Sequence, residues 1–122
     1  MKKQIKSFKA AISGLEDFFR HHFHAQVELV CAAVAILLGF VLELALVEWC
    51  GILLSIALVL TAEAINTSIE YLCDRITLEH DEQIGKTKDM AAGAVLMASI
   101  FALVVGLLIF GPKLLHLIGS LK

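Results

Sequence analysis

Residues 49–74 read WCGILLSIALVLTAEAINTSIEYLCD, an apolar first half followed by a half that contains polar residues at regular intervals. Glu63, Asn66, Glu70 and Asp74 follow one another at spacings of three and four. At about 100° per residue, these four side chains fall on a single arc of an α-helix, about 80° wide. The stretch therefore predicts a membrane helix with a polar stripe that runs towards one membrane surface.

Two more apolar segments flank this stretch, and each approaches the ~20 helical residues that cross a bilayer. The chain has 122 residues and is 59% hydrophobic. A soluble domain of this size has too much surface for its volume to hide so many apolar side chains. We therefore expect an all-α integral membrane protein with a single domain, 1–122, and transmembrane helices at 26–47, 49–72 and 90–111.

The segments outside the spans are predicted to lie near the membrane surface. In residues 1–25, apolar side chains recur every three or four positions and the polar face is basic. This pattern is typical of an amphipathic helix on an anionic leaflet. Gly111 and Pro112 are expected to end the third span, which leaves 112–122 as a short tail.

The distribution of Lys and Arg predicts the orientation, because cytoplasmic segments next to membrane spans are enriched in them. The N-terminal segment holds five and the loop after the second span holds three, against none between the first two spans and two in the tail. We expect a cytoplasmic N-terminus and a C-terminus outside. The net charge of −2 gives no sign of nucleic-acid binding.

Ionisable residues inside a span cost ~2.5 kcal/mol or more each, so they point to a function. A packing seam between helices is the alternative, since polar side chains do join membrane helices. Asn66 and Thr67 would suffice for a seam, whereas carboxylates would not be needed. Carboxylate and amide oxygens hold hard divalent cations such as Mg²⁺, which accompany nucleotide phosphates. Glu70 and Asn66, one helical turn apart, are the candidate metal ligands.

Further ionisable residues lie near the same cytoplasmic edge. Lys88 and Asp89 stand at the start of the third span, where Lys88 can neutralise phosphate oxygens and Asp89 can orient it or help hold the metal. Glu28 adds a carboxylate in the first span. The arrangement predicts phosphoryl transfer from a water-soluble donor to an acceptor in the bilayer. Glu63, the deepest acid, is the candidate general base that takes the proton of a lipid hydroxyl.

The segment EAINTSIE at 63–70, the pair Asp74-Arg75 and the segment KDMAAGAV at 88–95 closely resemble the prokaryotic diacylglycerol kinase family, which includes undecaprenol kinases. The resemblance covers essentially the whole chain. It implies a homotrimer with active sites shared between protomers, and MgATP as the phosphate donor. It also implies a bacterial inner membrane location and an acceptor that is diacylglycerol or undecaprenol, so that the product is phosphatidate or undecaprenyl phosphate.

The same resemblance implies a role for each residue of the motif. Glu63 matches the catalytic base and Glu70 a metal-binding glutamate that also belongs to the ATP site. Other active-site positions are matched by Asn66, Asp74, Lys88 and Asp89, the last two near the ATP phosphates. Glu28 takes a polar position of the first span.

Two other function classes stay open, and one of them comes from a departure from the family pattern. His22 stands where the family has a second metal-binding Glu, and it can ligate a metal only as neutral imidazole. A catalytically inactive relative would explain this change. A small transporter or proton-conducting bundle would also use carboxylates inside its spans, although it has little use for the Lys88-Asp89 pair.

Overall fold

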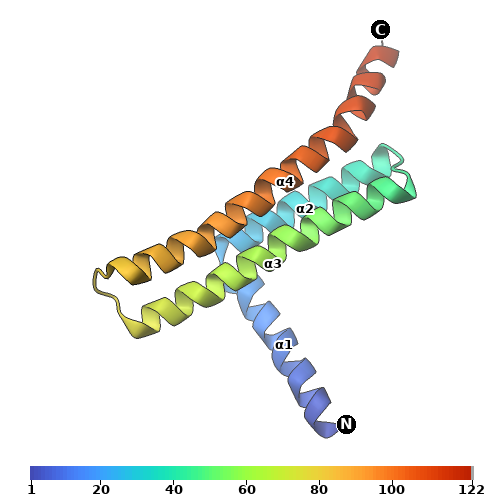
Figure 1. The fold of residues 1–122 in the computed structure, drawn as a ribbon. Helices are drawn as coiled ribbons and strands as arrows, with labels where there is room; N and C mark the ends of the chain where they lie inside the picture. Colours follow the sequence, from blue (N-terminus) through green and yellow to red (C-terminus); the bar gives the residue numbers. More distant parts are fainter. Residues whose placement is uncertain (122) are drawn as a thin grey trace.

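The computed structural model describes residues 1–121, and the chain is helical along nearly all of this length (Figure 1). Lys122, which was counted in the predicted tail, lies outside the described residues. The helices in chain order are α1 (Lys2–His21), α2 (Phe23–Val41), α3 (Leu46–Ile76) and α4 (Glu82–Ser120).

Three of these helices, α2, α3 and α4, are long and apolar enough to cross a membrane, which confirms the predicted all-α class with three membrane helices. They run side by side, while α1 leaves the bundle at a steep angle (Figure 1). Within the described chain, α3 contacts both α2 and α4, but α2 and α4 do not contact each other. The helix that carries the polar stripe is therefore the central one.

The first membrane helix is shorter than predicted, because α2 ends at Val41 and residues 42–45 form a turn. The Leu44 N–H donates to the Gly39 carbonyl at 3.0 Å, and Glu43 has a φ of 51°. The predicted end at residue 47 was wrong because the turn itself is apolar. Leu44 is buried, so hydropathy does not fall where the helix stops.

The α2–α3 hairpin depends on a close contact between Gly39 and Trp49. A Cβ atom built on Gly39 would lie 2.6 Å from the Trp49 Cη2 atom. The indole ring also packs against the Phe40 ring, with 4.8 Å between the ring centroids. Only glycine allows the indole to approach the α2 backbone this closely. The contact fixes how α3 leaves the turn.

The last helix is longer than predicted at both ends. It begins at Glu82, where the Asp81 carboxylate accepts a hydrogen bond from the Ile84 N–H at 2.9 Å. It also continues through Pro112, so the predicted helix end there was wrong. Lipid offers no water to hydrogen-bond the free backbone groups of a helix end. Continuing the helix through Pro112 leaves fewer such groups than ending it there. The last turns bend away from the bundle (Figure 1), and Lys113 pairs with Glu48 of α3 at 3.2 Å.

The junction between α1 and α2 is a single non-helical residue, His22. This residue has extended backbone angles, which end the first helix before the predicted boundary at 25. The Gln26 side chain donates to the Arg20 carbonyl at 2.9 Å, and the His22 ring stacks near the buried Phe18. The His22 Nε2 atom is hydrogen-bonded to the Tyr71 hydroxyl at 2.6 Å. The junction is thereby attached to α3.

The Gly39–Trp49 contact predicts the effect of adding one methyl group. Gly39→Ala gains up to ~1 kcal/mol of helix propensity, but the overlap with the indole ring costs ~1–3 kcal/mol. We expect a lower melting temperature in detergent than that of the wild type. Gly14→Ala is the control, because its Cβ would meet no atom within 4 Å. A Gly39→Ala protein that melts at or above the wild-type temperature would contradict this packing.

The His22–Tyr71 hydrogen bond predicts how firmly the junction is held. Tyr71→Phe removes only the hydroxyl group and should weaken the attachment by about 1 kcal/mol. Limited trypsin digestion after Arg20 should then be faster than in the wild type. In a His22→Ala background the same substitution should add little, since the partner is already gone. Equal digestion rates for wild type and Tyr71→Phe would show that the bond does not hold the junction.

Candidate active site

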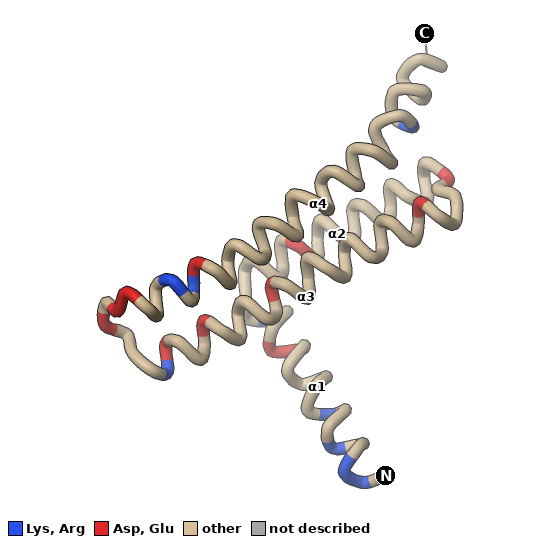
Figure 2. The backbone as a smooth tube through the Cα atoms, in the orientation of Figure 1, with Lys and Arg blue, Asp and Glu red and all other residues tan. Residues whose placement is uncertain are grey.

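Charged residues gather near the α3–α4 loop and along α1, and the middle of α4 carries none (Figure 2). The C-terminal half of α3 supplies most of the predicted site. Glu63, Asn66 and Thr67 are buried, each with 5–6% of its surface exposed. Glu70 and Asp74, further along the helix, are exposed. The polar stripe thus begins inside the bundle and emerges at its end.

The two predicted metal ligands of α3 lie together. The Asn66 side-chain nitrogen donates to a Glu70 carboxylate oxygen at 3.4 Å. The amide oxygen of Asn66 is buried and has no hydrogen-bond partner within residues 1–121. A buried acceptor without a partner costs about 1–3 kcal/mol. This pair therefore presents one free amide oxygen and one exposed carboxylate to a donor or a cation.

Lys88 is the basic residue that the fold brings to the stripe. Its ammonium group donates to the Asp74 carboxylate, which joins α4 to α3, and Glu70 also attracts it. Lys86 instead pairs with Glu82 on its own helix at 2.6 Å. Asp89 is exposed and makes no side-chain hydrogen bond or ion pair in the described part of the chain. Of the two predicted residues at the start of α4, only Lys88 is held in place.

Glu28 and Glu63 come together from different helices. The two carboxylates are close enough to repel each other across the α2–α3 interface. One oxygen of Glu28 is buried and has no partner in residues 1–121. Acidic side chains of two neighbouring helices therefore lie within electrostatic range of each other.

His22, the third predicted metal ligand, is bonded to Tyr71 rather than to Glu70 or Asn66. Its partner Tyr71 directly follows Glu70 in the sequence. Within the described residues, no three His, Cys, Asp or Glu side chains are grouped so that they could hold a metal ion. The sequence analysis gave Tyr71 no role, so it missed the hydrogen bond between Tyr71 and His22. A tyrosine next to a stripe residue was the available signal.

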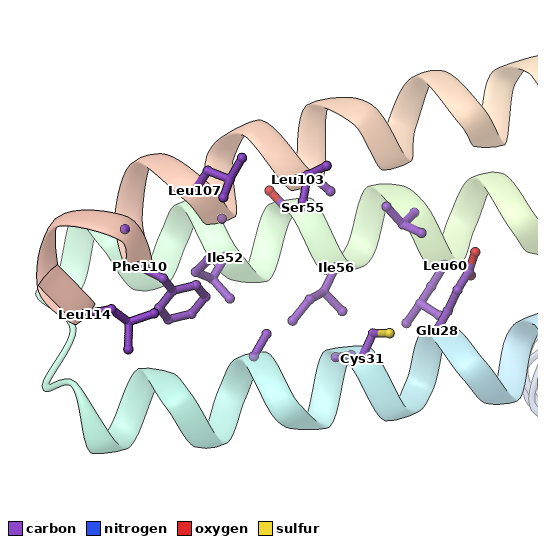
Figure 3. Close-up of a pocket in the computed structure, with 16 residues that line it drawn as sticks. Glu28, Cys31, Ile52, Ser55, Ile56, Leu60, Leu103, Leu107, Phe110 and Leu114 are labelled. Carbon is purple, nitrogen blue, oxygen red and sulfur yellow. The ribbon is translucent and has the colours of Figure 1, made fainter. Parts of the chain in front are cut away.

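A groove of about 440 Å³ opens between α2 and α4, with α3 as its floor (Figure 3). Glu28 lies at one end of it, and Phe110 and Leu114 lie at the other. Most of its lining is apolar. The sequence did not predict it, because its walls come from three helices and their separation is a property of packing alone.

Comparison with known proteins agrees with the resemblance. The profile of a family described as "Prokaryotic diacylglycerol kinase" matches residues 9–110. The chain is 37% identical over 110 residues to a Bacillus subtilis protein named undecaprenol kinase, covering 90% of this chain and 89% of that protein. It is 32% identical over 100 residues to the diacylglycerol kinase of Escherichia coli K12, covering 82% of each.

A third relative, the diacylglycerol kinase of Haemophilus influenzae, is 31% identical over 94 residues, which cover 77% of this chain and 80% of that protein. The matched residues include all three membrane helices up to residue 110 and every motif residue quoted above. The chain therefore belongs to the prokaryotic diacylglycerol kinase family and is a lipid kinase of the membrane.

Proposed function

We propose that this chain transfers the γ-phosphate of ATP to the hydroxyl group of a membrane lipid alcohol. Undecaprenol is the preferred acceptor in this proposal, because the relative with that name has 37% identity, and those named diacylglycerol kinase have 31–32%. One observation carries the proposal. A buried acid, Glu63, is followed along α3 by the exposed acids Glu70 and Asp74, and Asp74 is paired with Lys88 of α4. A lipid hydroxyl and a soluble nucleotide can meet between them.

The chemistry of the donor set fits Mg²⁺, which we propose as the cofactor. Mg²⁺ keeps several waters and binds through one or two carboxylates together with substrate phosphates, so it does not need a cage of protein ligands. The unpartnered Asn66 oxygen and the Glu70 carboxylate are oxygen donors of this kind. When bound there, the ion would neutralise phosphate charge.

Lys88 and Asp74 are proposed to hold the phosphates of ATP from the other side. Lys88 donates a hydrogen bond to the Asp74 carboxylate and is also attracted by Glu70, so its ammonium group is held in place before a nucleotide binds. A preorganised cation stabilises transferring charge without having to move during the reaction. Asp89 is free to reach the phosphate side, where it would orient Lys88 or a metal-bound water.

Glu63 is proposed as the general base. It is buried, so water has little access to its carboxylate. Glu28 is proposed to contact the hydroxyl group of the lipid, since its free oxygen faces this interior. His22 could contribute only its Nδ1 atom to a metal while Nε2 stays bonded to Tyr71. We therefore assign it first to the α1–α2 junction.

Assembly and location complete the proposal. A single chain leaves Glu70 and Asp89 exposed, which supports the homotrimer that the family resemblance implies. We place the protein in the bacterial inner membrane, with the N-terminus cytoplasmic and the C-terminus outside. The apolar side chains of α1, such as Phe8 and Ile12, are exposed and would lie in the cytoplasmic leaflet.

The rival interpretations have less support. A proton-conducting bundle gives no role to the ion pair between Lys88 and Asp74. An inactive relative was suggested only by His22, and the fold gives this residue a structural role with Tyr71. The kinase assignment accounts for both features.

The decisive experiment gives the purified protein ATP with undecaprenol or diacylglycerol and measures the phosphorylated lipid. Glu63→Gln keeps the shape of the side chain but cannot accept a proton, so kcat should fall by a factor on the order of 10²–10⁴. ATP affinity and assembly should stay near wild type. Glu43→Gln, an acid in the α2–α3 turn, is the control and should keep full activity. Near-wild-type turnover of Glu63→Gln would reject the role of Glu63 as general base. If the variant loses both its fold and its activity, the polar stripe is a packing seam instead.

The phosphate contact predicts different effects for two lysines that are two residues apart. Lys88→Met should raise the KM for ATP and lower kcat by roughly 10²-fold, because the cation acts on the transition state as well as in binding. Lys86→Met is the matched control, since Lys86 is paired with Glu82 on the surface, and its kinetics should stay near wild type. If Lys86→Met impairs ATP kinetics and Lys88→Met does not, the phosphate contact belongs to Lys86.

A further inference from the structure

A second pocket lies where α2 turns into α3, at the opposite end of α3 from Asp74. Its volume is about 510 Å³. One side is formed by residues 41–43, at the end of α2 and in the turn, and the other by α4 residues between 112 and 117. The last turns of α4 bend away from the bundle here, which leaves room between the two sides (Figure 1). We call this space the turn pocket.

The two sides of the turn pocket carry opposite charges. Glu43 lines the turn side. Lys113 and His116 line the α4 side, and their spacing of three residues puts them on one face of the helix. Charged residues at the turn and on the last turns of α4 can be followed in Figure 2. The side chains of Glu43 and His116 are exposed and have no hydrogen bond or ion pair within residues 1–121.

Lys113 is held in position by the start of α3. Its Nζ atom lies 3.2 Å from the Glu48 carboxylate, and the same carboxylate oxygen accepts a hydrogen bond from the Ala45 N–H at 2.7 Å. The Lys113 side chain is 29% exposed, so it is only partly free to move. An ammonium group has three N–H donors, and the contact with Glu48 leaves others for an anion. The turn pocket thus contains a positioned cation with spare donors.

The backbone at Glu43 is unusual for a residue with a long side chain. Its φ of 51° lies in the left-handed region, which glycine and asparagine adopt most easily. The turn itself would be better served by glycine, so backbone geometry does not explain a glutamate at this position. Such an outlier points to a role for the side chain. The carboxylate faces a pocket whose other side is basic.

The turn pocket also has the right depth for a lipid head group. The turn joins the end of α2, at Val41, to the start of α3, at Leu46, and both helices are long and apolar enough to cross a membrane. Trp49 in the first turn of α3 is an aromatic residue of the kind that is enriched at membrane interfaces. Leu42 and Leu117 give the pocket an apolar part beside the charged groups. A ligand that fits needs both charges and apolar chains.

We propose that the turn pocket binds phosphatidylethanolamine, with the lipid phosphate at Lys113 and His116 and the lipid ammonium at Glu43. A zwitterionic head group carries its two charges at opposite ends, as the two sides of the pocket do. Phosphatidylglycerol would bring no cation to Glu43, and the quaternary ammonium of phosphatidylcholine cannot donate a hydrogen bond to it. The site is separate from the kinase site. In the orientation proposed above it takes a lipid of the outer leaflet.

Other occupants match the turn pocket less well. A free phosphate ion would satisfy Lys113 and His116 but would be repelled by Glu43. A divalent cation would be repelled by Lys113, and no group of three metal-binding side chains is found within the described residues. An apolar helix of a second copy would take the charged groups out of water without giving them partners, which costs free energy.

The test measures lipid binding to the purified full chain in detergent by native mass spectrometry. Dioleoyl phosphatidylethanolamine, phosphatidylglycerol and phosphatidylcholine are compared at equal concentrations. For the wild type we expect one retained phosphatidylethanolamine per chain, and at least about fivefold weaker binding of the other two lipids. Lys113→Gln should weaken binding of all three by about tenfold, because they share the phosphate group. Glu43→Gln should weaken only phosphatidylethanolamine, so that its preference over phosphatidylglycerol is lost.

Three further variants separate a lost lipid contact from a loosened fold. Glu48→Gln breaks the same ion pair but keeps the cation, so it should retain the preference for phosphatidylethanolamine. His116→Ala lies outside the ion pair and should weaken all three lipids by about threefold. Lys86→Gln removes a lysine near the opposite end of α4 and should bind lipid as the wild type does. Circular dichroism checks that each variant keeps its helix content.

Four outcomes contradict the assignment. Equal binding of the three lipids by the wild type would indicate bulk lipid contact only. Unchanged binding in both Lys113→Gln and Glu43→Gln would place the lipid elsewhere on the protein. Loss of the preference in Glu48→Gln to the same extent as in Lys113→Gln would show that the ion pair shapes the turn and contacts no lipid. Complete displacement of the lipid by millimolar inorganic phosphate would assign the pocket to a free anion.

Discussion

The rest of the structure depends on the position of α3 between α2 and α4. A polar side chain in lipid needs a partner, and only the central helix can offer partners from two sides. Buried Glu63, Asn66 and Thr67 take that position. The exposed apolar residues of α2 and α4 face hydrocarbon, which is why so small a chain needs only a small core. The membrane and the polar stripe together decide the order of the helices.

The same arrangement separates the chemistry by depth. Glu28 and Glu63 lie within the bundle, whereas Asp74 and Lys88 stand where α3 and α4 extend towards the loop. In the proposed function, a water-soluble nucleotide and a membrane-bound alcohol would therefore reach one site from different sides. Transfer between them requires positioning and neutralisation of charge, which these side chains can provide without large motions.

The errors in the predicted helix boundaries have a common origin. Sequence patterns locate a helix end by a change of polarity or by a helix-breaking residue. The α2–α3 turn is apolar and is closed by the contact of Trp49 with Gly39, so no polarity change marks it. Pro112 was taken as a break, but α4 continues through it and is held to Glu48 by Lys113. Both outcomes depend on partners that are distant in sequence.

The sequence by itself determined the number and character of the membrane helices, the polar stripe of α3 and the family, because length, periodicity and motif spacing are local properties of the chain. Only the tertiary structure decided that Lys88 rather than Lys86 meets Asp74, that His22 bonds Tyr71, and that α2 and α4 leave a groove. These choices depend on how each helix is rotated and displaced against its neighbours. That is set by the packing of side chains from separate segments, which no local pattern encodes.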